Sequence, residues 1–137
     1  MVGGPVNNRC AATLLSKLGK HIYFKDNFDL VAIGATHVTT YLQGKPIRDH
    51  GAIVRIVNPF DKSKDVIMAL GCDTYGVLAA SLALTMKPEV EEIRAKLFSR
   101  IKSRLSNAGR DYLAIVECDV LGYDVTNVLL KSFRSIA

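Results

Sequence analysis

The stretch that most constrains the fold is an unbroken apolar run that stops at a glycine. Val66 to Leu70 contains only apolar residues, and Gly71 follows directly. A run of this kind is typical of a strand covered on both faces, as in the middle of a parallel sheet. After Gly71, either Asp73 or Thr74 can cap a helix that continues to about Leu84. The stretch therefore predicts a buried central strand, a tight turn and a helix.

A second glycine turn lies at the start of the chain. Gly3, Gly4 and Pro5 precede apolar residues at helical spacing, which predict a helix from Val6 to Leu18, and Gly19 is a natural stop. Such a turn normally follows a strand. We therefore expect either a very short leading strand or a chain that is a piece of a longer protein.

The remaining segments divide into strands, loops and one further helix. Alternating or β-branched runs predict strands at His21–Phe24, Leu30–Ile33, Gly51–Val57, Tyr112–Val120 and Asp124–Phe133, the last two joined as an antiparallel hairpin. Thr36–Gln43 fits either a strand or a helical turn, and Gly44–Asp49 is expected to be a loop. A proline followed by three glutamates predicts a helix over Pro88–Asn107.

This order of elements predicts a three-layer α/β domain. We expect a Rossmann-like or flavodoxin-like fold with a mostly parallel sheet and a C-terminal antiparallel hairpin. A length of 137 residues suits one domain over residues 1–137, either alone or as a fragment of a longer protein.

The composition also bears on where such a chain is found. No apolar stretch reaches the roughly 18 residues that cross a bilayer, so no membrane span is expected. Cys10, Cys72 and Cys118 form no CxxC pair and are expected to be free thiols. Together with the lack of a secretory signal, they predict a cytoplasmic protein.

The two glycine turns form the predicted ligand site. In an open α/β sheet, helix N-termini present unpaired N–H groups beyond the strand ends, and both turns face one crevice if their strands are neighbours. The alternative is that the glycines only let each helix fold back over the sheet and that Asn7 or Thr74 is only an N-cap. The candidate ligand-binding residues are Gly3, Gly4, Asn7, Asn8, Arg9, Gly71, Asp73, Thr74, Tyr75 and Gly76.

Motifs leave the ligand of these turns unidentified. The turns lack the GxGxxG and GK[ST] patterns, so no nucleotide cofactor is indicated, and the cofactor stays unknown. Arg9 favours a small anion at the first turn. Asp73 would repel a phosphate, and it suits a ribose hydroxyl or a metal better.

Catalytic, metal and nucleic-acid signatures are lacking. His21, His37 and His50 are too far apart in sequence to form a pair on one helix face, so no metal site is expected. No serine lies in a GxSxG elbow, so the sequence favours a non-enzymatic protein and leaves an enzymatic function undecided. The net charge of +5 permits weak attraction to anions. The basic residues of Pro88–Asn107 spread around the predicted helix, which favours a solvated face over a nucleic-acid partner.

Three motifs resemble a known domain family. They are Gly3-Gly4-Pro5 with Asn8, Asn58-Pro59-Phe60-Asp61, and Gly71 with Tyr75-Gly76-Val77. In this order they are similar to Rossmann-like domains of archaeal surface-layer proteins and related uncharacterised proteins, in which Asn is usual at Asp61 and Thr at Val77. The resemblance implies a role in assembly or sensing, and a cell-surface location if the chain belongs to a surface-layer protein.

Two functions follow from these observations. The first is a non-enzymatic assembly or regulatory module that acts as a homo-oligomer or within a larger parent chain, associating through Pro88–Asn107 or through the edge of the terminal hairpin. The alternative is a small-ligand or nucleotide-binding sensor or enzyme domain that uses the glycine turns at 3–9 and 71–76.

Overall fold

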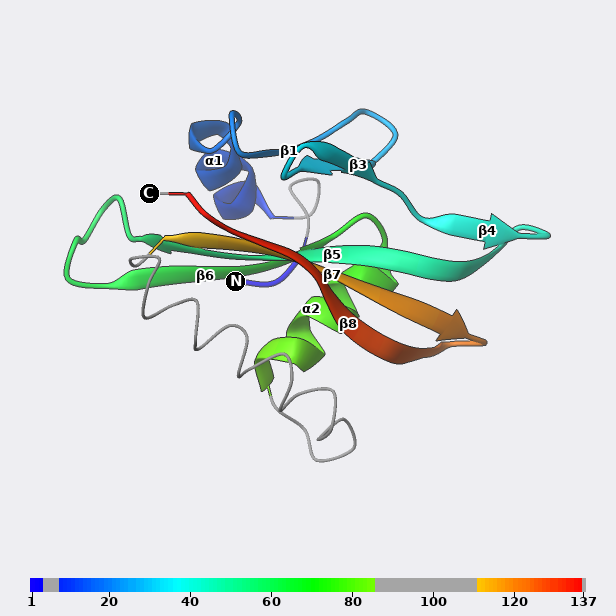
Figure 1. The fold of residues 1–137 in the computed structure, drawn as a ribbon. Helices are drawn as coiled ribbons and strands as arrows, with labels where there is room; N and C mark the ends of the chain where they lie inside the picture. Colours follow the sequence, from blue (N-terminus) through cyan, green and yellow to red (C-terminus); the bar gives the residue numbers. More distant parts are fainter. Residues whose placement is uncertain (4–7, 86–110, 137) are drawn as a thin grey trace.

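The computed structural model describes residues 1–3, 8–85 and 111–136, and its main element is a five-stranded sheet. One face of the sheet is covered by a helix and a small three-stranded sheet, and a second helix packs on the other face (Figure 1). The covering layer contains α1 (Arg9–Lys17), β1 (Ile22–Phe24), β2 (Leu30–Ala32) and β3 (Ala35–His37). The five-stranded sheet contains β4 (Thr40–Leu42), β5 (Lys45–Val57), β6 (Asp65–Gly71), β7 (Tyr112–Leu121) and β8 (Asp124–Ser135), and the second helix is α2 (Thr74–Thr85).

The long strand β5 organises the main sheet. Its residues Gly51–Val57 pair with β6, and Arg48–Arg55 pair with β7, which lies on the other side. The short β4 pairs with the first residues of β5, and β8 completes the sheet beside β7. Every one of these ladders is antiparallel.

The predicted Rossmann-like or flavodoxin-like fold with a mostly parallel sheet is therefore wrong. Val66–Leu70 does form a strand, but β6 makes an antiparallel hairpin with β5. Both faces of β6 are covered, because Met68 and Leu70 belong to the core beneath α1 and the small sheet, while Ala69 belongs to the core beneath α2. In the described part of the chain, parallel pairing is limited to an isolated bridge between Val2 and Ala69.

Several predicted elements agree with the structure. The terminal hairpin, the helix after Gly71 and the strands near His21 and Leu30 are confirmed as β7–β8, α2, β1 and β2. The ambiguous segment Thr36–Gln43 contributes to β3 and all of β4. The predicted helix Pro88–Asn107, with its basic residues, lies outside the described residues.

The loop predicted over Gly44–Asp49 is wrong, since β5 already begins at Lys45. Gln43 and Gly44 both have positive φ, so the chain reverses within this short turn and re-enters the sheet at once. Pro46 is tolerated because it pairs with the edge strand β4, ahead of the first β7 partner at Arg48.

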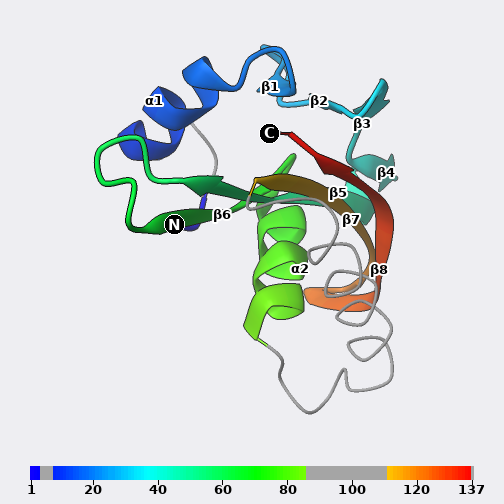
Figure 2. The ribbon, with the colours of Figure 1, turned by 60° about the vertical axis from the view of Figure 1, so that its left-hand side comes forward.

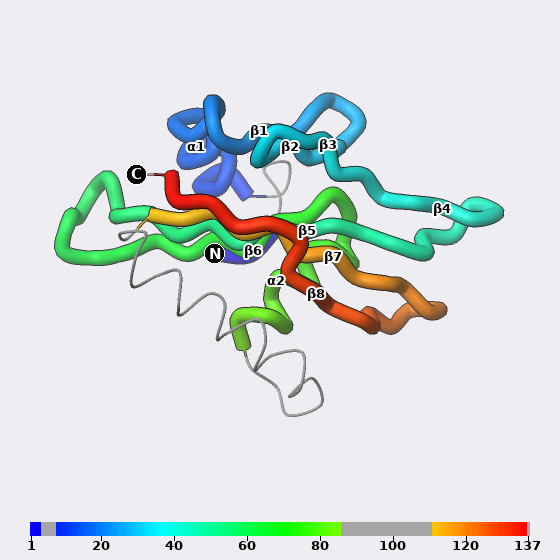
Figure 3. The backbone as a smooth tube through the Cα atoms, in the orientation of Figure 1, coloured from blue at the N-terminus to red at the C-terminus, as the bar shows by residue number. Residues whose placement is uncertain are grey.

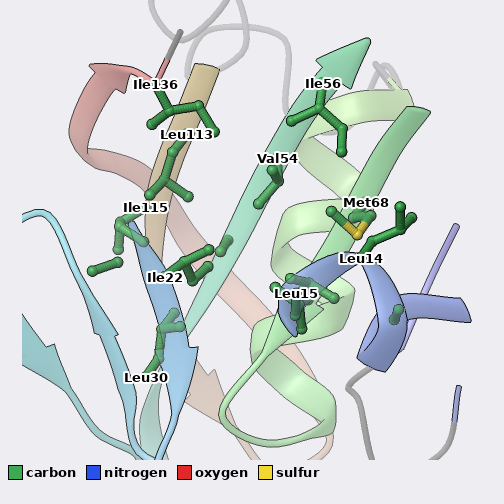
Figure 4. Packing of buried hydrophobic residues seen from close by; sticks show 14 residues of the cluster. Leu14, Leu15, Ile22, Leu30, Val54, Ile56, Met68, Leu113, Ile115 and Ile136 are labelled. Atoms are coloured by element: carbon green, nitrogen blue, oxygen red, sulfur yellow. The ribbon is translucent and has the colours of Figure 1, made fainter. Parts of the chain in front are cut away.

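Two apolar cores hold the layers together. On the α1 side, Leu14 and Ile22 point toward Val54, Met68 and other buried residues of the main sheet (Figure 4). On the α2 side, the alanines of the helix pack against strand residues that point to this face, such as Ile53 and Val116. Figure 2 shows α2 lying along this face. Burying a large aliphatic side chain contributes about 1.5–3 kcal/mol, so the sheet is stabilised from both faces.

At one end, the sheet extends beyond both covering helices. The β4–β5 and β7–β8 hairpins run side by side to this end, because β5 pairs with β7 (Figure 3). We call residues 40–48 and 119–126 the double-hairpin end. Among the described residues, no helix is long and apolar enough to cross a membrane.

Candidate functional site

The second glycine turn brings the backbone of α2 against the backbone of β5. A Cβ atom on Gly76 would lie 2.0 Å from the carbonyl oxygen of His50, and one on Gly51 would lie 2.1 Å from the carbonyl oxygen of Gly76. Only glycine fits such an approach. Gly51 and Gly76 therefore allow the close packing of α2 on β5.

A buried carboxylate occupies the N-terminus of α2. Asp49 is fully buried, and its Oδ2 accepts a hydrogen bond of 2.6 Å from the N–H of Gly76. Its Oδ1 accepts from Thr39 Oγ1 at 2.7 Å and from the N–H of His50 at 2.9 Å. Burial raises the pKa of Asp49, and the three hydrogen bonds act in the opposite direction. The chain thus supplies its own anion to this helix end.

The neighbouring residues of this turn also bond within the protein. Asp73 Oδ1 accepts from the N–H of Thr74 at 2.6 Å, and its Oδ2 accepts from the Tyr41 hydroxyl at 3.2 Å. Burial and this carboxylate raise the pKa of Tyr41. Gly71 ends β6, and Tyr75 packs partly buried on the α2-side core.

Gly3, the first residue of the first glycine turn, lies beside β6. Gly3 donates to the carbonyl of Ala69 at 3.0 Å, next to the parallel Val2–Ala69 bridge, so the first turn starts beside the end of β6. Asn8 caps α1 and accepts from the N–H of Ala11 at 3.1 Å. Arg9 is exposed. Gly4 and Asn7 lie outside the described residues.

Sequence reasoning missed a charged group of residues on three strands of the main sheet. His50 Nε2 lies 2.8 Å from Glu117 Oε2, and Lys131 Nζ lies 3.1 Å from the same oxygen. His50 Nδ1 lies 2.8 Å from the carbonyl oxygen of Val38. We call His50, Glu117 and Lys131 the His50 cluster. Lys131 Nζ also lies 3.2 Å from His50 Nε2, so the three side chains of the cluster contact one another.

The charges of this region are compensated within it. Burial acts to raise the pKa of Glu117, but hydrogen bonds from His50 and Lys131 outweigh burial and hold that pKa below its usual value. Arg48 Nε lies 3.2 Å from Asp119 Oδ1, and Asn127 donates to Asp119 Oδ2 at 3.0 Å. The network joins β5, β7 and β8, and through Val38 it also joins the segment between β3 and β4.

A second histidine and a cysteine lie close to the His50 cluster. The ring of His37 lies 5.3 Å from that of His50, and burial lowers the pKa of His37. The Cys72 thiol donates to the carbonyl of His37, and burial raises its pKa to about 12, which keeps it protonated and weakly nucleophilic. Within residues 1–3, 8–85 and 111–136, no group of three or more His, Cys, Asp or Glu is placed to hold a metal ion. The hydrogen bonds of the His50 cluster connect the strands β5, β7 and β8.

The double-hairpin end carries several large exposed side chains. Tyr41 and Leu42 of β4 are 54% and 61% exposed, and Leu121 and Tyr123 at the β7–β8 turn are 75% and 91% exposed. Lys45 lies at the β4–β5 turn, and Asp124 lies at the β7–β8 turn. This end therefore presents apolar side chains together with one basic and one acidic turn.

Comparison with protein-family models, curated proteins and solved structures found no match to this chain. The resemblance to surface-layer domains therefore rests on the sequence motifs alone.

Proposed function

We propose that the protein is a non-enzymatic assembly module that self-associates through its double-hairpin end. The observation that carries this proposal is the group of large exposed side chains at that end, led by Tyr123 and Leu121. Tyrosine is enriched in protein interfaces because it combines a large apolar ring with a hydroxyl that can stay hydrogen-bonded. Exposed apolar side chains gathered on adjoining hairpins favour burial against a partner.

The charges of the two turns support a second copy of this chain as the partner. Neither Lys45 nor Asp124 has an ion pair or side-chain hydrogen bond to another described residue. In a two-fold dimer, the basic turn of one copy can face the acidic turn of the other, and each contact occurs twice. The short edge strand β4 and the outer strand β8 both reach this end and can add backbone hydrogen bonds.

Sedimentation equilibrium of the full chain, over a range of protein concentrations, tests self-association. The wild-type protein is expected to dimerise. Tyr123→Ser is expected to weaken the dimer at least tenfold, because it removes an aromatic contact on both sides of the two-fold axis. Tyr23→Ser is the matched control, since Tyr23 is also exposed but lies on β1, away from this end. Circular dichroism confirms that each variant is folded.

A charge exchange tests the orientation of the two copies. Lys45→Asp and Asp124→Lys are each expected to weaken the dimer several-fold, and the double variant is expected to recover most of the loss. A wild-type protein that stays monomeric at every concentration overturns the proposal. So does a Tyr123→Ser variant that dimerises like the wild type. Failure of the double variant to recover overturns the two-fold pairing of the turns.

The free cysteines bear on the compartment in which assembly would take place. Cys10, Cys72 and Cys118 are all unpaired. Unpaired thiols persist most readily in a reducing compartment, which supports the cytoplasm over the surface-layer setting that the sequence motifs imply.

A further inference from the structure

A pocket is lined by residues of α1, β6 and the β5–β6 loop. Figure 1 shows α1 and the β5–β6 loop at the end of the molecule opposite the double-hairpin end. Its volume is about 370 Å³, within the range of small-molecule sites. Leu14 of α1 and Val66 of β6 supply apolar walls, and the ring of Phe60 comes from the β5–β6 loop. The remaining lining residues are Met1, Arg9, Cys10, Thr13 and Asn58.

The charged groups of this pocket are cationic. Among the described residues that line it, Arg9 is the one with a charged side chain, and none is an aspartate or glutamate. Lys17 Nζ lies over the ring of Phe60, 5.1 Å from its centre. The N-terminus of α1 has no acidic residue in its first turn, so the helix dipole adds positive potential on the same side.

The side chain of Arg9 is available to a ligand. It is exposed, and it makes no ion pair with another described residue. Phe60 also lines the pocket and is 78% exposed. A ligand that covers the ring while its anionic group meets Arg9 would satisfy both side chains.

We propose that this pocket binds a small amphipathic anion, which has an aliphatic body and a carboxylate head. The body lies against Leu14, Val66 and Phe60, and the carboxylate accepts hydrogen bonds from Arg9. Apolar burial supplies most of the affinity, and the guanidinium selects the charged ligand over a neutral one of the same length.

Cys10 offers a direct readout because it lines the pocket and is exposed. Burial raises the pKa of Cys72 and of Cys118 to about 12, so these thiols react slowly in the folded protein. Decanoate, below its micellar concentration, is the probe. It is expected to slow the alkylation of Cys10 by N-ethylmaleimide, followed by intact mass, and to raise the melting temperature.

Two related compounds separate the parts of the ligand. Decanol has the aliphatic body without the charge and is expected to protect Cys10 about tenfold less well. Acetate has the charge without the body and is expected to give no protection. Equal protection by decanoate and decanol, or no protection by decanoate, overturns the proposal.

Variants locate the binding. Arg9→Gln should weaken decanoate binding about tenfold, as for one charge-assisted hydrogen bond, and leave decanol binding unchanged. Thr13→Phe, on the exposed rim, should block both ligands. Lys25→Gln removes an equal charge from the β1–β2 turn and is the matched control. Replacing Arg9 can itself change how fast the adjacent Cys10 is alkylated. The alkylation rate with ligand is therefore compared with the rate of the same variant without ligand.

A last control separates this site from assembly. Lys45→Asp changes the far end of the molecule and should bind decanoate with wild-type affinity, whatever its oligomeric state. Unaltered decanoate binding by both Arg9→Gln and Thr13→Phe would place the ligand elsewhere and refute the assignment.

Discussion

Replacing Gly76 by alanine should destabilise the protein, although the residue lies within a helix. In most helices this change stabilises by about 1 kcal/mol, because alanine is the better helix former. Here the new Cβ atom would lie 2.0 Å from the carbonyl oxygen of His50 and 3.1 Å from Asp49 Oδ2. Ordinary contact begins near 3.4 Å, so the start of α2 would have to move away from β5 by more than 1 Å.

The expected cost has two parts. Overpacking of a close backbone contact costs about 1–3 kcal/mol. Moving α2 also lengthens the 2.6 Å hydrogen bond from Gly76 to the buried Asp49 carboxylate, whose loss costs about 1–3 kcal/mol. After the gain in helix propensity is subtracted, the free energy of unfolding should fall by about 3 kcal/mol.

Urea unfolding followed by circular dichroism measures this difference. Gly19→Ala is the matched control, because a Cβ there would meet its nearest atom, the carbonyl oxygen of Ser16, at an unstrained 3.7 Å. The control should be neutral or stabilised by up to about 1 kcal/mol, through the lower entropy of the unfolded chain. If Gly76→Ala proved as stable as the control, the close packing of α2 on β5 would be refuted.

Two further predictions concern titrating groups. Because the pKa of Glu117 is held low in the folded state, its contribution to stability is present above the unfolded pKa and disappears as pH falls through the folded value. Glu117→Gln should therefore cost about 1–3 kcal/mol at pH 7 and progressively less in acid, and a cost independent of pH would contradict the ion-paired cluster. A disulfide-exchange reagent should titrate Cys10 quickly, and Cys72 and Cys118 only after denaturation, because burial raises both pKa values to about 12. Rapid reaction of all three thiols in the folded protein would rule out that burial.

Hydrophobic pattern predicted strands well and their direction poorly. The run Val66–Leu70 correctly indicated a strand covered on both faces. The hydrophobic pattern of a strand does not show which neighbour the strand pairs with. Layers on both faces can cover an antiparallel hairpin as fully as a parallel sheet. We expected parallel strands because continuous apolar runs occur mostly in parallel sheets. The residues of the run do not themselves determine the direction of pairing.

The candidate site was harder to predict for a related reason. Gly71, Asp73 and Thr74 correctly indicated a turn and the start of a helix. The carboxylate at the N-terminus of that helix belongs to Asp49, which lies on β5. His50 and Glu117 are directly opposite each other only because of the β5–β7 register. A single sequence contains no signal that fixes such a register, so the network could not be found before the structure.

The β5–β7 ladder has a consequence for how the chain folds. Its members lie up to 71 positions apart in sequence, as for Arg48 and Asp119, whereas β5–β6 and β7–β8 are local hairpins. Closing so long a loop is entropically expensive, so the two hairpins should form early and meet late. While β7 has not yet emerged from the ribosome, the edge of β5 that pairs with β7 is left without its partner strand. Misassembly with a neighbouring nascent chain would begin at this unpaired edge of β5.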